Sequence, residues 1–382
     1  HVRTPESFRT GVDVFIANTV RKGRDGKVYA PFKDMKGNLV WKSPQEIADL
    51  AVAFPQELNR KTKRVGVMQD GKIKYVPREK VDLVMPNFEN AFSPLGNMIP
   101  MKSAVKAQRM AMASRMTTQA LPLEEPESPW VRAGIMGEPD NSYEKKYGRY
   151  MGAVSADRPG TVVSVDNHKI RVKYEDGSTE DKQLYHNFPY NRKTYLHNTA
   201  LVKPGDRFTA GQMLAKSNYT DNDGVTALGK NLYAAYLPYK GMNFEDAVVI
   251  SESAAKKKLS SQHMYQHGID WSPDYKQGKA AFISLFANKY DRKTLGNMDD
   301  DGVIKEGTVV NFGDPLILAA KKRDIAYGKV HRKREAPYSD SSDVWKHHSP
   351  GVVTDVFKTS KGTTVLVKSL AEMQVGDKLS GR

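Results

Sequence analysis

Short stretches of alternating apolar and polar residues, separated by turn residues, fill the first hundred positions of the chain. The alternation has a period of two at residues 12–16 and 73–76, and Asp-Gly pairs that favour tight turns occur at residues 25–26 and 70–71. A period of two is the spacing at which successive side chains point to opposite faces of a strand. We therefore expect the N-terminal region to be mostly β.

The pattern changes at residues 103–114, where good helix formers follow Ser103, a residue type that favours the N-cap. A short helix is predicted here. Lys102, Lys106 and Arg109 are spaced i, i+4, i+7, which would place them on one helix face, with alanines on the other. This basic face could present charge to a phosphate, or it could be an ordinary solvated surface.

Strand patterns resume near residue 160. Residues 161–165 and 169–174 alternate around a turn at 166–167, and the second stretch places three cations on one side of its strand. One face of this predicted sheet is therefore expected to be basic.

Two later segments, 202–215 and 304–316, share a pattern of valine, glycine and aspartate with a second turn, which is typical of turns in barrel-type β modules. Residues 352–356 and 363–367 form a further predicted hairpin. Residues 252–350 are more polar and irregular, which favours an inserted peripheral module.

Composition narrows the function classes. The 382 residues allow two or three domains, and 59 Lys and Arg against 44 Asp and Glu give a formal charge of +15. Such an excess most often indicates a polyanionic partner such as nucleic acid, because cations that neutralise phosphates release counterions; an inert basic surface is the alternative.

The absence of cysteine excludes disulfides, thiol nucleophiles and zinc–thiolate sites. No apolar run approaches the ~20 residues of a membrane span.

Two motifs carry candidate chemistry. Residues 242–247 read Met-Asn-Phe-Glu-Asp-Ala, with adjacent carboxylates at Glu245 and Asp246, and residues 376–382 read Gly-Asp-Lys-Leu-Ser-Gly-Arg, with a lysine at Lys378. Carboxylates that approach a hydrated magnesium ion and a lysine that contacts phosphate as a point charge suit metal-bound phosphates. The pair of motifs indicates nucleotide chemistry.

Several strings, in the same order, resemble the β subunit of multisubunit DNA-directed RNA polymerases. They are Thr-Pro-Glu-Ser at 4–7, Ile-Pro at 99–100 with Arg109, Met-Thr-Thr-Gln-Ala-Leu-Pro at 116–122, Ala-Leu-Gly-Lys-Asn at 227–231, Leu-Pro-Tyr-Lys-Gly-Met-Asn-Phe-Glu-Asp at 237–246, and Val-Gly-Asp-Lys-Leu-Ser-Gly-Arg at 375–382. The resemblance runs, with gaps, from one end of the chain to the other.

The sequence also departs from that family. It starts at His1 without an initiator methionine and stops before the histidine and second lysine of the family's lysine-bearing box, Thr118 stands where arginine is usual, and the inserted region is shorter. We therefore expect a central piece of a diverged β subunit. It would be either an artificial cut or part of a naturally divided subunit such as large bacterial viruses encode.

The resemblance implies roles for four catalytic residues. Glu245 and Asp246 would lie near the second metal ion and the phosphates of the incoming nucleotide, acting through water. Lys378 would contact the RNA 3′ end or the reactive phosphate, and Arg109 would neutralise the triphosphate as pyrophosphate leaves.

Three further residues are candidate nucleic-acid contacts. The resemblance places Gln119 against the RNA backbone beside the RNA–DNA hybrid and Glu6 near the downstream fork, and Lys106 belongs to the predicted basic helix face.

The resemblance also implies partners. The principal Mg²⁺ would be held by an aspartate triad, Asp-Phe-Asp-Gly-Asp, on a β′-like large subunit; that string is absent here. The chain is therefore expected to polymerise nothing alone. Its other partners would be the rest of the β subunit, the DNA template, the RNA product, nucleoside triphosphates and an initiation factor, in a bacterial cytoplasm or nucleoid, an infected cell or a virion, with no membrane.

The expected fold is mostly β with short helices (α+β) in several modules, including part of a double-psi-type β barrel. Residues 1–98 would form a β-rich region near the fork and downstream DNA, and 99–251 the hybrid-binding region and first part of the catalytic barrel. Residues 252–350 would form a flap-like insertion, and 351–382 the return to the barrel.

Other patterns point elsewhere. A non-catalytic nucleic-acid-binding scaffold or transcription regulator on the same fold is the alternative function, although a pure polyanion binder gains nothing from carboxylates that face phosphate. The Asp299-Asp300-Asp301-Gly302 run resembles a metal cluster, yet consecutive aspartates project in different directions and the glycine marks a turn. His331, His347 and His348 are too scattered for a zinc site and are expected to be solvated.

Overall fold

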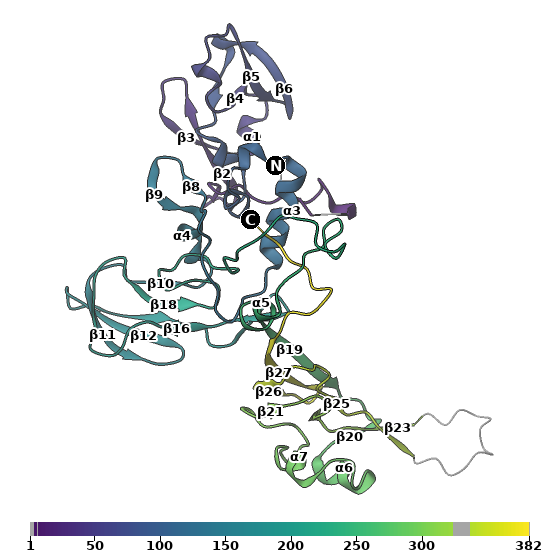
Figure 1. The fold of residues 1–382 in the computed structure, drawn as a ribbon. Coiled ribbons are helices and arrows are strands. Elements are labelled where there is room, and N and C mark those ends of the chain that lie inside the picture. Colours follow the sequence, from purple (N-terminus) through teal and green to yellow (C-terminus); the bar gives the residue numbers. More distant parts are fainter. Residues whose placement is uncertain (1–3, 6, 324–336, 382) are drawn as a thin grey trace. The chain divides into compact units, whose positions relative to one another are not determined.

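The computed structural model describes residues 4, 5, 7–323 and 337–381. Strands outnumber helices along the chain, and the helices are short, which confirms the mostly β expectation (Figure 1). Within the described residues the longest helix, α3, spans Ala107–Gln119, and none of the helices there has the length and apolar character needed to cross a membrane. Glu6, His331 and Arg382 lie outside the described residues.

The chain divides into two compact units. His1–Ala120, Trp130–Tyr147 and Leu379–Arg382 make up the first, and Leu121–Pro129 with Gly148–Lys378 make up the second. The finer four-part division suggested by the sequence stays a prediction.

The first unit is built on a seven-stranded sheet. Its strands are β1 (Arg21–Lys22), β2 (Val28–Asp34), β3 (Leu39–Lys42), β4 (Val52–Ala53), β5 (Arg64–Gln69), β6 (Lys72–Pro77) and β7 (Leu83–Val84). They follow the order β1-β2-β7-β4-β5-β6, with β3 paired to β2, so β6 lies at an edge. The core of the β4–β6 part includes Ala53, Val65 and Val67, all fully buried.

Local sequence explains the β5–β6 hairpin. Asp70 and Gly71 form its two-residue turn with φ of +51° and +69°, and Gln69 pairs with Lys72 across it. Two positive φ values characterise the turn that matches the twist of a hairpin, and Asp-Gly adopts them readily. The hairpin predicted at this position is confirmed.

The strand expected at residues 12–16 is wrong. These residues have no regular structure, and Val12 and Ile16 are 77% and 63% exposed. Alternation predicts a strand only where a partner strand offers hydrogen bonds, and among the described strands none pairs with this segment.

The helix expected at residues 103–114 is present but shifted, and its N-cap was wrongly placed at Ser103. A 3-10 turn at Lys102–Ala104 precedes α3, and Lys106 occupies the N-cap with an extended backbone. The predicted stripe of three cations is therefore broken, because of the three only Arg109 lies within the helix. Lys102 instead packs over the ring of Tyr143, at 5.4 Å from its centroid.

Smaller elements complete the first unit. They are α1 (Pro44–Ile47), α2 (Pro94–Asn97), β8 (Gly134–Ile135), β9 (Glu138–Ser142) and α4 (Tyr143–Gly148), which ends at the start of the second unit. Met110 and Ser114 are the buried positions of α3.

The second unit begins with a group of short sheets. Its strands are β10 (Val154–Ser155), β11 (Gly160–Val165), β12 (Lys169–Tyr174), β13 (Thr179–Gln183), β14 (Phe188–Tyr190), β15 (Thr194–Leu196), β16 (Asn198–Ala200), β17 (Arg207–Phe208) and β18 (Met213–Ser217). Sheets form in the orders β13-β12-β11-β17, β10-β18-β16 and β14-β15, an arrangement compatible with part of a barrel. The predicted hairpin around residues 166–167 is the confirmed β11–β12 hairpin.

The rest of the second unit forms around a four-stranded sheet in the order β19-β27-β26-β21. Its elements are α5 (Glu252–Lys257), β19 (Ser261–Asp270), β20 (Tyr275–Lys276), α6 (Lys279–Leu285), α7 (Arg292–Gly296), β21 (Val309–Val310), β22 (Pro315–Ile317), β23 (Ala320–Lys322), β24 (Tyr338–Asp340), β25 (Asp343–Val344), β26 (Gly351–Lys358) and β27 (Gly362–Ala371). The predicted hairpin near residues 352–367 is the β26–β27 hairpin.

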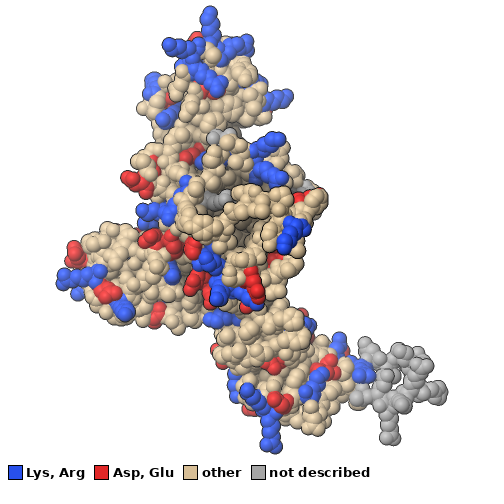
Figure 2. Space-filling view, viewed as in Figure 1, with Lys and Arg blue, Asp and Glu red and all other residues tan. Residues whose placement is uncertain are grey.

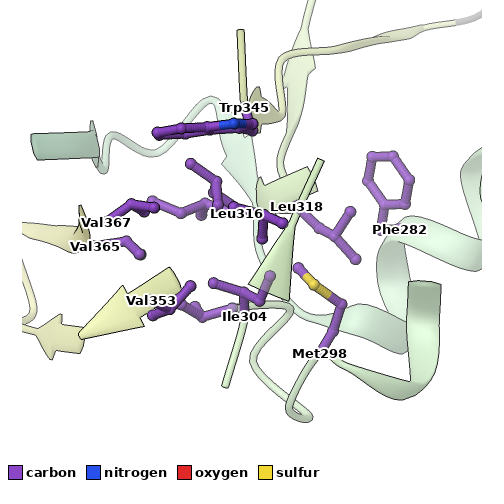
Figure 3. Close-up of a cluster of buried hydrophobic side chains, with 12 residues drawn as sticks. Phe282, Met298, Ile304, Leu316, Leu318, Trp345, Val353, Val365 and Val367 are labelled. Atoms are coloured by element: carbon purple, nitrogen blue, oxygen red, sulfur yellow. The ribbon is translucent and has the colours of Figure 1, made fainter. Parts of the chain in front are cut away.

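Trp345 lies in the hydrophobic core of this region (Figure 3). Its indole is fully buried with Leu316, Val365 and Val367, and its Nε1 donates to the Ser349 carbonyl at 2.9 Å. The ring is thus fixed both by packing and by a satisfied polar group.

Candidate functional site

The Asn-Phe-Glu-Asp motif lies in a loop that Asn243 braces. Its Oδ1 accepts from the Tyr239 amide at 2.9 Å, and its Nδ2 donates to the Leu237 carbonyl at 2.7 Å. A single side chain therefore replaces the strand pairing that this segment lacks. Asn243 therefore stabilises the loop, and the loop carries the carboxylates of Glu245 and Asp246 on its surface.

Glu245 and Asp246 are both exposed on this loop. Glu245 has a φ of +57°, in the left-handed region that is costly for a residue with a Cβ, by about 1–2 kcal/mol. The turn is closed by the Ala247 amide, which donates to the Phe244 carbonyl at 3.2 Å. Such strained residues cluster at functional sites, so the backbone at Glu245 is an observation that favours a role for this loop.

The Gly-Asp-Lys motif forms a tight turn in which the aspartate is structural. Asp377 Oδ2 accepts from the Gln374 amide at 2.8 Å, and the Asp377 amide donates to the Gln374 carbonyl at 3.1 Å. Gly376 supplies the positive φ of +96° at the third position of the turn. Lys378 follows directly and is exposed.

The same turn occurs at two other places in the second unit. At Lys203–Asp206 and at Asn311–Asp314, the aspartate Oδ2 accepts from the first residue's amide at 2.7 Å in both turns, and the glycine φ is +93° and +91°. The turns expected in the 202–215 and 304–316 segments are thus confirmed. The third copy, at 374–377, could have been found by searching for Gly-Asp at the end of each strand segment.

The cationic and polar candidates of the first unit lie on or beside α3. Arg109 is exposed, and its Nη1 lies 3.9 Å from Met112 Sδ. Gln119 is the last residue of the helix and is exposed, and Lys106 is its exposed N-cap.

The structure brings only some of the candidates together. Glu245 and Asp246 share one loop, and Lys378 belongs to the same unit; across the described residues, no hydrogen bond or ion pair links Lys378 to either carboxylate. Arg109 belongs to the other unit. The proposed roles of these residues therefore remain proposals.

A buried polar cluster near the start of α3 was missed by sequence reasoning. Glu89 accepts from the Tyr143 hydroxyl at 2.5 Å, and Glu144, which is 1% exposed, accepts from the Ala133 amide. Burial lowers the pKa of Lys102, and the two nearby carboxylates oppose that shift. No sequence pattern marks these glutamates, because their partners are distant in the chain.

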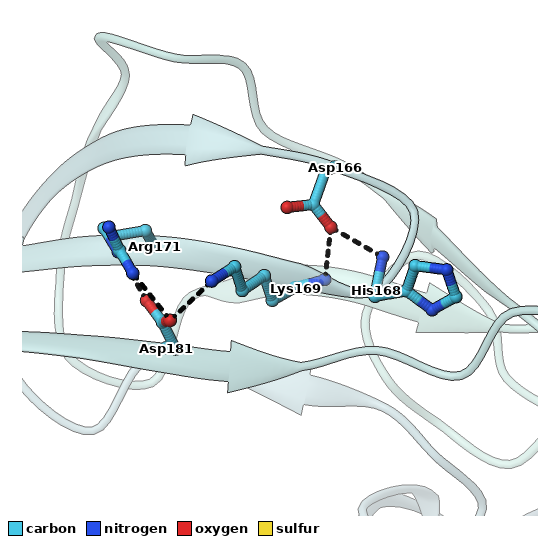
Figure 4. A network of polar contacts seen from close by, with 5 residues as sticks. All are labelled: Asp166, His168, Lys169, Arg171 and Asp181. Atoms are coloured by element: carbon cyan, nitrogen blue, oxygen red, sulfur yellow. Dashed lines mark hydrogen bonds and ion pairs between the residues drawn. The ribbon is translucent and has the colours of Figure 1, made fainter.

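The basic face predicted on β12 is partly neutralised. Lys169 Nζ lies 2.9 Å from Asp181 Oδ2, and Arg171 Nε lies 2.6 Å from Asp181 Oδ1 (Figure 4). Hydrogen bonds, first from Arg171 and then from Lys169, hold the pKa of Asp181 well below its usual value. Lys169, Arg171 and Lys173 share one side of the strand, as predicted, and Asp181 of the neighbouring strand β13 supplies one counter-charge. The face is therefore basic, but less so than the sequence alone indicates.

The acidic turn at residues 299–301 is closed by a lysine. Lys358 Nζ lies 2.5 Å from Asp299 Oδ2 and 2.7 Å from Asp301 Oδ2, and Asp299 Oδ1 accepts from the Val303 amide. These carboxylates therefore have protein partners.

His347 is not the solvated residue expected, because it is partly buried and stacks on Tyr265 at 3.8 Å between ring centroids. His348 is exposed as expected. Within the described ranges, no three His, Asp or Glu side chains converge as metal ligands. Glu245 and Asp246 alone offer an incomplete ligand set, which fits contact through water with a magnesium ion held mainly elsewhere.

Comparison with known proteins identifies the family. Residues 155–382 match the model of the family "RNA polymerase Rpb2, domain 6". The chain is 30% identical over 412 residues to the DNA-directed RNA polymerase subunit beta of Thermus aquaticus, covering 100% of the chain and 36% of that protein. It is 28% identical over 425 residues to the same subunit of Prochlorococcus marinus (strain MIT 9301), covering 100% of the chain and 37% of that protein.

A third relative, the same subunit of Thermus thermophilus, is 30% identical over 326 residues, with 83% of the chain and 28% of that protein covered. The chain thus spans between about a quarter and two fifths of the length of these relatives. The family match covers the braced carboxylate loop and the Gly-Asp-Lys turn. The chain belongs to the RNA polymerase Rpb2 domain 6 family and corresponds to a part of the β subunit of DNA-directed RNA polymerase.

Proposed function

We propose that the chain is the part of a β subunit that completes the nucleotidyl-transfer site of a DNA-dependent RNA polymerase and holds the RNA–DNA hybrid. The observation that carries this proposal is the exposure of Glu245 and Asp246 on a loop braced by Asn243, with Glu245 in a strained backbone conformation. Family membership supports it.

Nucleotidyl transfer requires no covalent bond between the protein and the nucleotide. The RNA 3′-hydroxyl attacks the α-phosphate of the incoming nucleotide, and pyrophosphate leaves, so catalysis depends on positioning and charge neutralisation. Lys378 would contact the RNA 3′ end or the reacting phosphate, and Arg109 would offset the charge of the triphosphate as it is cleaved. Gln119, Lys106 and Glu6 would contact nucleic acid.

Magnesium would supply Lewis-acid stabilisation of the phosphates when bound. Glu245 and Asp246 would orient water of its hydration shell, while a β′-like subunit with the aspartate triad would provide its principal ligands. The remaining parts of the β subunit, the DNA template, the RNA product and an initiation factor would complete the assembly.

Single-nucleotide extension by the assembled polymerase tests the proposal. Lys378→Ala is expected to slow extension on the order of 10²-fold, the typical effect of losing one group that stabilises transition-state charge. Arg109→Ala should act in the same direction, and both variants should assemble normally.

Arg207→Ala is the matched control. Arg207 is an exposed cation that follows Asp206 in the same kind of turn that precedes Lys378. Its loss should leave the extension rate unchanged. Extension by Lys378→Ala and Arg109→Ala at the unaltered rate, in a complex that contains the partner subunit, would favour the non-catalytic scaffold instead.

A further inference from the structure

The β5–β6 hairpin of the first unit carries an exposed apolar face. Strand register places Arg64, Met68, Ile73 and Tyr75 on one side, with Gly66 directly across from Tyr75. Met68, Ile73 and Tyr75 are 38%, 65% and 65% exposed, whereas Val65 and Val67 on the opposite side are buried in the core. One aromatic ring and two aliphatic side chains therefore face solvent on a rigid strand pair.

Cations without a carboxylate partner lie around this face. Lys61, Lys63 and Arg64 are exposed, and of the ion pairs among the described residues none involves these three. The nearby Arg60 and Lys74 are paired with Glu57 and Asp70. In the view of Figure 2, Lys and Arg side chains stand out from the lobe that carries β4, β5 and β6.

The loop that bears Lys61 and Lys63 is held in place. Arg78, just after β6, donates to the carbonyl of Leu58 and, at 2.9 Å, to that of Arg60. The Arg78 amide also donates to the Lys63 carbonyl at 3.2 Å. These bonds anchor the basic loop beside the end of the strands, so its charges are positioned near the apolar face.

Addition of a protein strand to this edge is disfavoured. β6 is the edge strand of its sheet, but the Arg64 guanidinium donates to the Tyr75 carbonyl and Pro77 lacks an amide. Lys72 and Lys74 on the same strand add charge. Prolines and lysines on an edge are devices that oppose strand pairing.

We propose that this face, formed by Met68, Ile73 and Tyr75 and bordered by Lys61, Lys63 and Arg64, binds single-stranded DNA. An aromatic ring flanked by cations is the arrangement that stacks an unpaired base while neutralising its phosphates. The face carries no uncharged amide or hydroxyl apart from the Tyr75 phenol, and the nearby Glu57 carboxylate is already engaged by Arg60 and by the Gly66 amide, so the face has little with which to read a 2′-hydroxyl. The aliphatic side chains suit the methyl group of thymine.

Binding of the full chain to a short fluorescent oligothymidylate tests the proposal. Tyr75→Ala should weaken binding about tenfold, the scale of one lost stacked base, and Tyr75→Phe should restore it. Phe357→Ala is the control, because Phe357 is also an exposed aromatic residue on a hairpin, 54% exposed, but in the other unit. Lys63→Gln should lower the salt dependence by about one ion, whereas Lys36→Gln on another hairpin of the same unit should not.

The thermal midpoint of Tyr75→Ala shows whether this variant is folded. We expect the midpoint to be unchanged, because the Tyr75 ring is mostly exposed. Equal weakening by Phe357→Ala would overturn the proposal, as would equal affinity for a duplex of the same length. Affinity for oligouridylate as high as for oligothymidylate would overturn the choice of DNA. Because the assay needs no partner subunit or nucleotide addition, its result is independent of the proposed catalytic function.

Discussion

Replacing Gly351 by alanine is expected to destabilise the second unit through overpacking. Gly351 begins β26 and pairs with Ser369 on β27. A Cβ atom there would lie 2.5 Å from Val367 Cγ1 and 2.9 Å from Trp345 Cζ2. Both neighbours are fully buried, and the hydrogen bond of the Trp345 indole to the Ser349 carbonyl prevents the ring from moving aside.

Two effects of opposite sign determine how much Gly351→Ala changes the free energy of unfolding. Overpacking of a core costs about 1–3 kcal/mol, while alanine gains about 0.4–1 kcal/mol by restricting the unfolded chain. Contacts this short against buried atoms belong in the upper part of the first range, so we expect a net loss of about 2 kcal/mol. For a unit of this size that loss lowers the unfolding midpoint by about 4–8 °C.

Calorimetric unfolding of the full chain measures this shift. Gly296→Ala is the matched control, because Gly296 ends α7 in the same unit and a Cβ there would meet no atom within 4 Å. Alanine is favoured over glycine in a helix by about 0.5–1 kcal/mol, so this variant should unfold slightly later. A midpoint for Gly351→Ala at or above that of the unaltered chain would refute the packing argument.

Two further predictions concern titration and charge. Burial, and then the charge of His347, lowers the pKa of His263, so the folded state binds fewer protons than the unfolded state. The contribution of His263 to the free energy of unfolding is therefore fully present above the unfolded pKa of about 6.5 and is lost as the pH falls through the lower folded pKa. His263→Gln should flatten this dependence of the thermal midpoint on pH. Asp181→Ala should raise the net charge beside Lys169 and Arg171 by one and steepen the salt dependence of DNA binding by about one ion, and an unchanged slope would show that this face of β12 contributes nothing to DNA binding.

Sequence reasoning succeeded where structure is set by neighbours in the chain. The Asp-Gly turn of β5–β6 and the alternation of β12 depend on local backbone preference, and both were predicted. The strand expected at residues 12–16 failed because a strand also needs a partner, which no local pattern reveals.

In the candidate site, too, features set by nearby residues were predicted and features set by distant partners were not. Motif strings located Glu245, Asp246 and Lys378, and the structure then added the bracing role of Asn243, which depends on atoms four and six residues away. The counter-charge that Asp181 of β13 supplies to the cations of β12 was not predicted, because it comes from another strand. The register between two strands decides which charges meet, and composition cannot supply it.

The Gly-Asp turn has a consequence for how this protein can diverge. Each copy closes on its own atoms, so its shape makes no demand on the residue that comes next. Arginine, proline and lysine occupy that place at Arg207, Pro315 and Lys378. A lineage can therefore exchange the exposed group while the support beneath it stays intact, and new chemistry at such a position requires only one substitution.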